Sequence, residues 1–194
     1  MRETLPLSKI QEAILGFLQG RKDVVLFGAQ AVNAYVSEPR MTQDVDLLSN
    51  RADELAEELR AFLSEKFHIA VRVREIGDKG LRIYQVRKEG NRHLIDIRVV
   101  TEFPETEIVE DIQVLSPLEL IASKIISFHS RYGKPKSWTD RRDLAVLLLQ
   151  FPQLKEKVSE TLQAKNVGEA VLETWAEISS QDFQIEDEDE DLIF

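Results

Sequence analysis

The stretch PRMTQDVDLL, residues 39–48, places two aspartates one residue apart in a run that is otherwise rich in apolar side chains. If residues 41–48 form a strand, the side chains of Asp44 and Asp46 project from the same face, because residues two apart on a strand share a face. Two carboxylates on one partly buried surface repel each other, and burying them is costly unless a positive charge lies between them. The stretch therefore predicts a sheet strand that carries a divalent metal.

The residues on either side of this stretch predict a sheet that brings a third carboxylate to the same place. DVVLFG (23–28) predicts a short strand that ends at glycine, and AQAVNAYV (29–36) predicts a helix. A further helix is predicted at 51–67, with Asn50 as its N-cap residue. Three further strands are predicted at 68–76, 80–88 and 92–100, and the last of these carries Asp96 in an apolar run. If that strand lies beside the first aspartate strand, three carboxylates converge.

Three converging carboxylates predict a particular chemistry. Such a set can hold two Mg²⁺ ions about 3.5–4 Å apart. Magnesium favours a few carboxylates together with substrate phosphates, so the expected substrate is a nucleoside triphosphate. A phosphate-binding turn is expected at Gly28 and Ala29, where a strand ends and a helix begins, because free N–H groups at a helix start attract anions. Arg40 and Thr42, just ahead of Asp44, are placed to reach phosphate oxygens.

The two ends of the chain read as helical, apart from an acidic tail. Ser8 and Gln11 have the spacing of a capping box for a first helix that runs to Gly20. From Ser116 onward we expect helices at 117–131, 138–150, 152–163 and 167–179. The predicted fold class is α+β, with a mixed β-sheet flanked by helices in 1–115, a helical C-terminal half in 116–180 that completes a nucleotide cleft, and a tail in 181–194.

The charge distribution is uneven. The formal net charge is −10, but the tail alone carries seven acidic residues and no basic one. The segment 121–145 is locally basic, with six cations against two aspartates: Lys124, Arg131, Lys134, Lys136, Arg141 and Arg142 against Asp140 and Asp143. The tail is therefore expected to lie against this basic segment and to compete there with nucleic acid or triphosphate.

Composition also indicates a compartment. The chain has no cysteine and no run of eighteen apolar residues, and its N-terminus lacks the apolar core of a signal peptide. These features predict a cytoplasmic protein with no membrane partner.

The segment FGAQAVNAYVSEPRMTQDVDLL resembles the signature of the nucleotidyltransferase (DNA polymerase β-like) superfamily, and its Arg-x-Thr-x-Asp-x-Asp spelling is most similar to the AbiEii/AbiGii-type toxin-like nucleotidyltransferases. SPLELIASKIISFHSR and TDRRDLAVLL are similar to later helices of that family. The resemblance covers roughly residues 24–150. At the second turn position the chain has Ala29, where the family has glycine or serine, so a hydroxyl contact to triphosphate is lost there.

The resemblance implies transfer of a nucleoside monophosphate from a nucleoside triphosphate (NTP) onto a hydroxyl of RNA, such as tRNA, or of protein, with pyrophosphate leaving. It implies that Asp44 and Asp46 bind both Mg²⁺ ions, and that Asp96 binds one and helps activate the acceptor. It also implies a toxin paired with an antitoxin-like protein, and a nucleotide site in the helical half. Lys124 would hold the triphosphate, and the other matching positions there are Arg131, Asp140 and Asp143.

Other interpretations of the same residues stay open. The fold could serve as an inactive binding or assembly module, which Ala29 favours. Asp96 could be a half-exposed sheet residue paired with Arg92 or Arg98. Lys124 and Arg131 could form a solvated helix face, and Asp140 and Asp143 could cap the next helix. The three histidines show no spacing typical of metal ligands, which argues against a zinc site.

Overall fold

The structure is a computed structural model that describes residues 5–77 and 80–184. The predicted acidic tail lies outside the described residues from 185 onward. By their internal contacts the residues form two compact units. The sheet unit comprises the chain up to Ala34 together with Pro39–Ser116, and the helical unit comprises Tyr35–Glu38 together with the chain from Pro117 onward.

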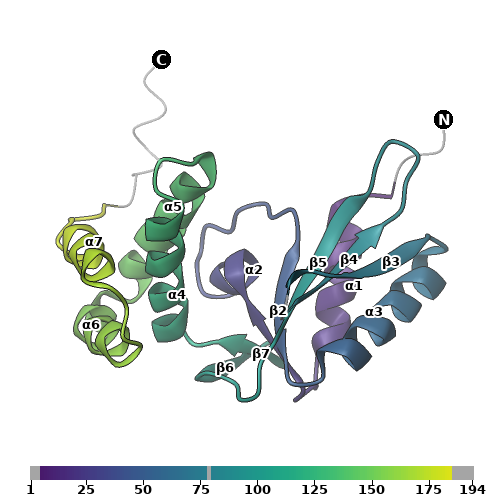
Figure 1. Ribbon diagram of the computed structural model, residues 1–194, viewed down its shortest axis with the longest axis horizontal. Coiled ribbons are helices and arrows are strands. Elements are labelled where there is room, and N and C mark those ends of the chain that lie inside the picture. Colours follow the sequence, from purple (N-terminus) through teal and green to yellow (C-terminus); the bar gives the residue numbers. More distant parts are fainter. Residues whose placement is uncertain (1–4, 78–79, 185–194) are drawn as a thin grey trace. The chain divides into compact units, whose positions relative to one another are not determined.

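The sheet unit is built on a mixed sheet of seven strands in the order β3-β4-β5-β2-β1-β7-β6 (Figure 1). The strands are β1 (Val24–Phe27), β2 (Val45–Ser49), β3 (Val71–Glu75), β4 (Gly80–Gln85), β5 (Arg92–Val99), β6 (Thr106–Val109) and β7 (Ile112–Leu115). Strand β2 runs parallel to β5 and antiparallel to β1, and β1 runs parallel to β7. The strand that carries Asp96 therefore lies beside the strand that carries Asp46, which is the condition for the carboxylates to converge.

One face of this sheet is apolar and covered by helices. Helices α1 (Leu7–Leu18) and α3 (Ala52–Phe67) contact each other, and α3 contacts β2, β3, β4 and β5. The side chains of Leu47, Ile83 and Ile97 are buried with almost no exposed surface. The short helix α2 (Gly28–Asn33) follows β1 at once. The strands alternate between this core face and a second face, and the candidate site lies on the second.

The helical unit contains α4 (Pro117–Ser130), α5 (Pro135–Gln150), α6 (Lys155–Ala164) and α7 (Glu169–Ser179), with a 3₁₀ turn, η2, at Pro152–Leu154. Helix α4 contacts the other three helices and so forms the centre of the unit. Leu120, Ile121 and Ile125 are fully buried there. The helical C-terminal half is thus confirmed. No helix in the described parts of the chain combines the length and the apolar character needed to cross a membrane.

Several local predictions are wrong. Helix α1 begins after Pro6 without a side-chain cap, because Gln11 instead donates to the carbonyl and hydroxyl oxygens of Thr42. Helix α3 has Arg51 at its N-cap and no side-chain cap, so Asn50 does not cap it. Strand β2 begins at Val45, one residue after Asp44. Asp44 therefore lies just outside the strand that carries Asp46.

The hairpin β6–β7 is a feature that sequence reasoning missed. Its two turn residues, Glu110 and Asp111, both have positive φ values of 50° and 64°. Such a turn usually contains glycine or asparagine, and their absence removed the usual signal for a hairpin. Strand β7 then extends the sheet by pairing with β1.

Candidate active site

The two strand aspartates lie directly opposite each other. Asp46 on β2 pairs in register with Asp96 on the neighbouring parallel strand β5. Asp44 immediately precedes β2, and the side chains of Asp44 and Asp96 are 23% and 22% exposed. The parallel pairing of two strands far apart in the sequence thus brings the three predicted carboxylates to one face of the sheet, where solvent and a substrate can reach them.

Gly28 shapes the floor of this group. It has a positive φ of 72°, and a Cβ built at this position would collide with the carboxylate of Asp46. The approach follows from the β1–β2 register, which sets Phe27 opposite Asp46 and so carries the chain past that carboxylate as α2 begins. The predicted strand–glycine–helix turn is therefore present next to Asp46. Since α2 has only six residues, any attraction for phosphate here comes chiefly from the backbone N–H groups at its start.

Asp96 is held by two basic side chains. Arg82 on β4 donates from Nε and Nη2 to its two oxygens at 2.6 and 2.8 Å, and Nε2 of His93 lies 2.9 Å from Oδ1. Burial of this carboxylate works to raise its pKa, but the hydrogen bonds with His93 and Arg82 outweigh burial and hold the pKa of Asp96 well below its ordinary value. Asp96 is therefore an ionised, fixed carboxylate, paired with Arg82 rather than with Arg92 or Arg98.

His93 is the site residue that sequence reasoning missed. Its Nδ1 lies 3.1 Å from Oδ2 of Asp44, so the ring bridges Asp44 and Asp96. Ligand atoms of these three residues all lie within 4.8 Å of one another, the spacing of a group that could hold a metal ion. Asp46 is not part of that group. The spacing of the histidines in the sequence gave no signal for this group, because its other two members are aspartates.

A bulge in β5 explains how His93 reaches this face. On β4, Ile83 and Tyr84 are consecutive, but their partners on β5 are Ile95 and His93, so Leu94 is an extra residue. Residues three apart normally lie on opposite faces of a strand, and one extra residue reverses that relation. His93 consequently faces the same way as Asp96, and its ring lies 5.7 Å from that of Tyr84.

The loop before Asp44 is pinned to the sheet unit. Asn33 accepts a hydrogen bond from the backbone N–H of Arg40 and donates one to its carbonyl oxygen, at 3.0 and 2.8 Å. Thr42 is only 7% exposed, and its hydroxyl accepts a hydrogen bond from Gln11. The Arg-x-Thr spacing therefore has a structural use, since it anchors the loop that presents Asp44.

The four predicted nucleotide-binding residues of the helical unit form an ion-pair network between α4 and α5. Nζ of Lys124 lies 2.6 Å from Asp143 and 3.5 Å from Asp140, and Arg131 contacts Asp140 at 2.9 Å. The Lys124 side chain is 8% exposed, so the solvated-face interpretation is wrong for it. Asp140 and Asp143 lie inside α5, which begins at Pro135, so they do not cap it. Arg131, at 32% exposure, is the most accessible of the four.

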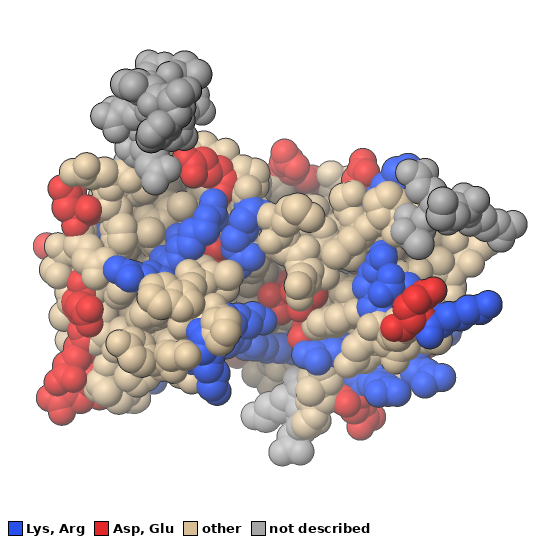
Figure 2. All heavy atoms as spheres, turned by 90° about the horizontal axis from the view of Figure 1, so that it is seen from above, with Lys and Arg blue, Asp and Glu red and all other residues tan. Residues whose placement is uncertain are grey.

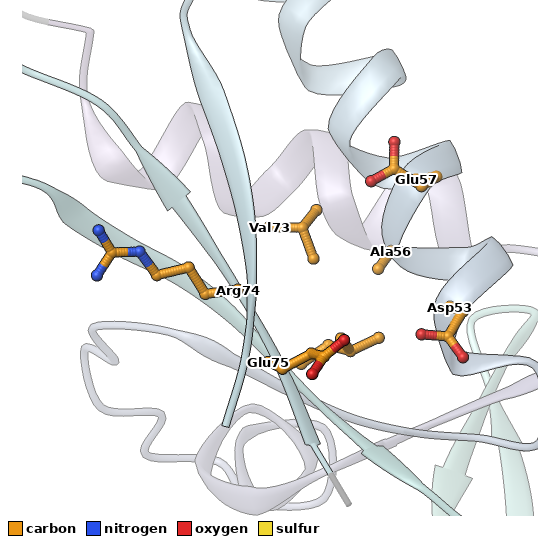
Figure 3. Close-up of a pocket in the computed structure, with 7 residues that line it drawn as sticks. Asp53, Ala56, Glu57, Val73, Arg74 and Glu75 are labelled. Atoms are coloured by element: carbon orange, nitrogen blue, oxygen red, sulfur yellow. The ribbon is translucent and has the colours of Figure 1, made fainter. Parts of the chain in front are cut away.

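A separate hollow lies on the helix-covered side of the sheet. Figure 3 shows Asp53, Ala56 and Glu57 of α3 beside Val73 of β3, while Arg74 extends from the opposite side of that strand. In the strand register, Arg74 of β3 lies opposite Arg82 of β4, and Arg82 lies opposite Asp96 of β5. The Arg74 side chain therefore projects from the face that carries Asp96. The hollow is thus separated from the carboxylate group by the sheet and is not part of the candidate site.

Comparison with known families accounts for most of the chain. Residues 12–192 match the model of the family described as "Nucleotidyl transferase AbiEii toxin, Type IV TA system". A search of curated protein sequences finds no match.

Solved structures share the fold at low sequence identity. The Megavirus polyadenylate synthase matches with a TM-score of 0.60 and 15% identity over 75% of this chain, which spans about a third (32%) of that larger protein. JHP933 from Helicobacter pylori matches with a TM-score of 0.56 and 16% identity over 89% of this chain and 87% of its own. ANT(2″)-Ia, solved in complex with adenylyl-2″-tobramycin, matches with a TM-score of 0.55 and 16% identity over 83% of this chain and 97% of its own. These likenesses support the nucleotidyltransferase-like fold.

Proposed function

Because the chain belongs to the AbiEii family of nucleotidyltransferase toxins, we propose that it transfers a nucleoside monophosphate from an NTP to a hydroxyl group of RNA. The acceptor oxygen forms a bond to the α-phosphorus, the bond between the α- and β-phosphates breaks, and pyrophosphate leaves. The observation that carries the proposal is the register of Asp46 against Asp96, with Asp44 immediately before the strand that carries Asp46.

These residues suit divalent metal ions. The carboxylates lie on a half-exposed face, which leaves room for water and phosphate ligands of the kind that Mg²⁺ retains. Two bound Mg²⁺ ions would supply charge neutralisation on the phosphates and the acceptor oxygen. We assign Asp44 and Asp46 to metal binding. Asp96, which lies opposite Asp46 and is held by Arg82, contributes its negative charge and a fixed position near the acceptor oxygen.

The triphosphate is expected beside Asp46, at the turn of Gly28 and Ala29 where β1 ends and α2 begins. Arg40 supplies a cation from the loop before Asp44. The hydroxyl of Thr42 already accepts from Gln11, so we assign Thr42 to holding that loop. In the helical unit we propose Arg131 as the phosphate contact that a nucleotide can reach, with Lys124, Asp140 and Asp143 holding the helices that present it.

A polyanionic acceptor is favoured by the charge on the carboxylate-bearing face. Four arginines project from β3, β4 and β5 on that face, and we call this set the arginine face: Arg72, Arg74, Arg82 and Arg98. Arg82 is paired with Asp96, but the other three are exposed residues that make no ion pair within the described residues. The guanidinium groups of Arg74 and Arg98 lie over the rings of Tyr84 and Phe27. Figure 2 shows Lys and Arg atoms gathered over this side of the sheet unit. Such a surface binds phosphate backbones and favours RNA over a neutral acceptor.

The loop after α4 and the first turn of α5 together offer a second, independent feature of this kind. Tyr132 and Trp138 are 78% and 67% exposed, and Lys134 and Lys136 lie between them in the sequence. Exposed aromatic rings among cations are typical of surfaces on which unpaired bases stack. We therefore propose single-stranded or looped RNA as the acceptor. A tRNA presents such an unpaired 3′ end.

The proposal is tested by incubating the protein with each of four α-labelled NTPs, Mg²⁺ and total RNA or a protein extract. We expect label in RNA and release of pyrophosphate, both lost in Asp46→Asn. Label in protein would replace RNA with a protein acceptor. No transfer with any NTP or acceptor would favour the inactive binding module.

Binding is tested separately with single-stranded RNA. The Arg72→Ala/Arg74→Ala variant is expected to weaken binding about tenfold at low salt, with a shallower salt dependence. The control is Arg60→Ala, which removes an arginine of α3 paired with Glu57 on the other side of the sheet. Equal loss in both variants would show that overall charge, not the arginine face, governs binding.

Membership of a toxin family also motivates a biological proposal. We propose that the protein acts on RNA in the cytoplasm as the toxin of a toxin–antitoxin pair with a protein antitoxin. Expression of the wild type should then arrest growth, expression of Asp46→Asn should not, and a neighbouring gene should relieve the arrest. Equal toxicity of the two forms would separate toxicity from catalysis.

A further inference from the structure

His93 occupies an unusual position between two carboxylates of the candidate site. Its Nε2 lies 2.9 Å from Oδ1 of Asp96, and its Nδ1 lies 3.1 Å from Oδ2 of Asp44. The bulge at Leu94 in β5 turns His93 to the face that carries Asp96, so the strand itself places His93 in the site.

The side of the ring that faces Asp96 is fixed by a chain of contacts. Arg82 donates to both oxygens of Asp96, and Nε2 of His93 lies within hydrogen-bond distance of Oδ1 of the same carboxylate. A carboxylate held in this way orients an imidazole and keeps a proton on the nearer nitrogen. In the neutral tautomer that carries its proton on Nε2, the arrangement Arg82–Asp96–His93 directs the lone pair of Nδ1 toward Asp44. Arg82 and Asp96 act as positioning residues.

The side that faces Asp44 has the dimensions of a metal site. Two ligand atoms that each lie about 2.1 Å from one ion, at right angles to each other, are roughly 3 Å apart. The observed distance of 3.1 Å between Nδ1 and Oδ2 matches that separation. We propose that His93 Nδ1 and Asp44 Oδ2 bind one first-row transition-metal ion, with Mn²⁺ as the probe, in preference to Mg²⁺. This inference deepens the proposed function by giving one of its two metal positions a nitrogen ligand.

The selectivity follows from ligand chemistry. Mg²⁺ takes oxygen ligands almost exclusively, whereas imidazole nitrogen suits transition-metal ions. Asp46 does not belong to the Asp44–His93–Asp96 group, and a metal position held by its carboxylate would stay suited to Mg²⁺ carried by the triphosphate. The two metal positions of this chain therefore differ in the ion that they prefer.

The test measures Mn²⁺ binding to the untagged full chain without NTP or RNA. Loss of the free Mn²⁺ electron paramagnetic resonance signal gives the affinity, and electron spin echo modulation detects a coordinated imidazole nitrogen. We expect nitrogen coupling in the wild type. His93→Gln should lose that coupling and bind Mn²⁺ about 10–100-fold more weakly, while its Mg²⁺ affinity, measured by competition, should change several-fold less. Arg82→Gln should lower Mn²⁺ affinity about tenfold with the nitrogen coupling retained.

The chain offers a matched control because it has only three histidines. The double variant His68→Gln/His129→Gln leaves His93 as the sole histidine and should keep the nitrogen coupling, which decides the question even if His93→Gln does not fold. Absence of nitrogen coupling in the wild type at saturating Mn²⁺, its loss in the double variant, or equal Mn²⁺ affinity in His93→Gln would each overturn the inference. Unchanged Mn²⁺ affinity in Arg82→Gln would overturn the positioning role. None of these readouts requires turnover, so nucleotide transfer can fail while the metal inference stands, and the reverse.

Discussion

Gly28 and Asp46 approach each other so closely that the Asp46 carboxylate fills the space that a β-carbon of residue 28 would need. Gly28 also has a φ of 72°, a conformation that costs other residues about 1–2 kcal/mol. Both constraints arise because β1 and β2 are antiparallel, with Phe27 opposite Asp46. The glycine therefore permits the turn and makes room for a candidate metal ligand.

Replacement of this glycine should damage both stability and activity. We expect Gly28→Ala to lower the free energy of unfolding by more than about 2 kcal/mol, through strain and displacement of Asp46, and to abolish transfer. Urea denaturation and the labelled-NTP assay measure the two effects. The control is Gly16→Ala in α1, where the new β-carbon meets nothing within 4 Å. It should stabilise the protein by about 0.5–1 kcal/mol. Wild-type stability of Gly28→Ala would contradict the close approach.

Asp46→Asn should separate folding from metal binding. The variant should keep its circular dichroism spectrum, and its melting temperature without metal should be unchanged or raised, because one of several clustered negative charges is removed. The rise in melting temperature that Mg²⁺ and NTP give the wild type should disappear. Wild-type turnover in this variant would refute the assignment of Asp46 to the metal site.

Lys124 is predicted to matter mainly for folding. Lys124→Ala leaves Asp143, which is fully buried, without its cation at 2.6 Å. Breaking one side of a buried ion pair costs about 3–5 kcal/mol. Lys165→Ala removes a more exposed pair with Glu119 and should cost about 0–1 kcal/mol. Denaturant titration of the two variants measures the difference.

A double replacement checks the cause of that loss. Lys124→Met/Asp143→Leu removes both charges together and should recover most of the stability lost in Lys124→Ala. If recovery of stability also restores NTP binding, Lys124 has no contact with nucleotide. If NTP binding stays lost in a stable double variant, the triphosphate contact implied by the family resemblance holds.

The ion pair at the start of β1 predicts a pH dependence of stability. Arg21 donates to both oxygens of Asp23 at 3.0 and 2.7 Å, and these hydrogen bonds lower the pKa of Asp23 despite partial burial. A carboxylate whose pKa is lower in the folded state stabilises the fold above its unfolded pKa of about 4, and this contribution is lost as the pH falls further. Asp23→Asn should therefore melt below the wild type at pH 7, and the gap should narrow below about pH 4.

A control for this prediction is Glu12→Gln in α1, which replaces an exposed carboxylate that makes no ion pair within the described residues. It should melt with the wild type at pH 7. A gap between Asp23→Asn and the wild type that stays constant from pH 7 to pH 3 would show that the Arg21–Asp23 pair does not contribute through its charge.

The local order of elements could be predicted from the sequence because each signal lies within a few residues. The strand that ends at Gly28, the paired Asp44 and Asp46, the apolar strand around Asp96 and the helical half all depend on short-range periodicity and turn chemistry. These signals, in that order, were also sufficient for the family resemblance. They placed Asp46 and Asp96 in the strands where the structure has them, and Asp44 one residue before its strand.

What the tertiary structure decided depends on contacts between distant segments. The extra residue Leu94 is defined only by pairing with β4, and without it His93 would face away from Asp96. Lys124 is buried only because Asp143 lies across from it on another helix, 19 residues later. The same cation would be solvated on a lone helix. Register and burial are set by packing between distant segments, and a periodic pattern in the sequence does not identify which segments pack together. The sequence therefore determined which residues bear the chemistry, while the fold determined which of them come into contact.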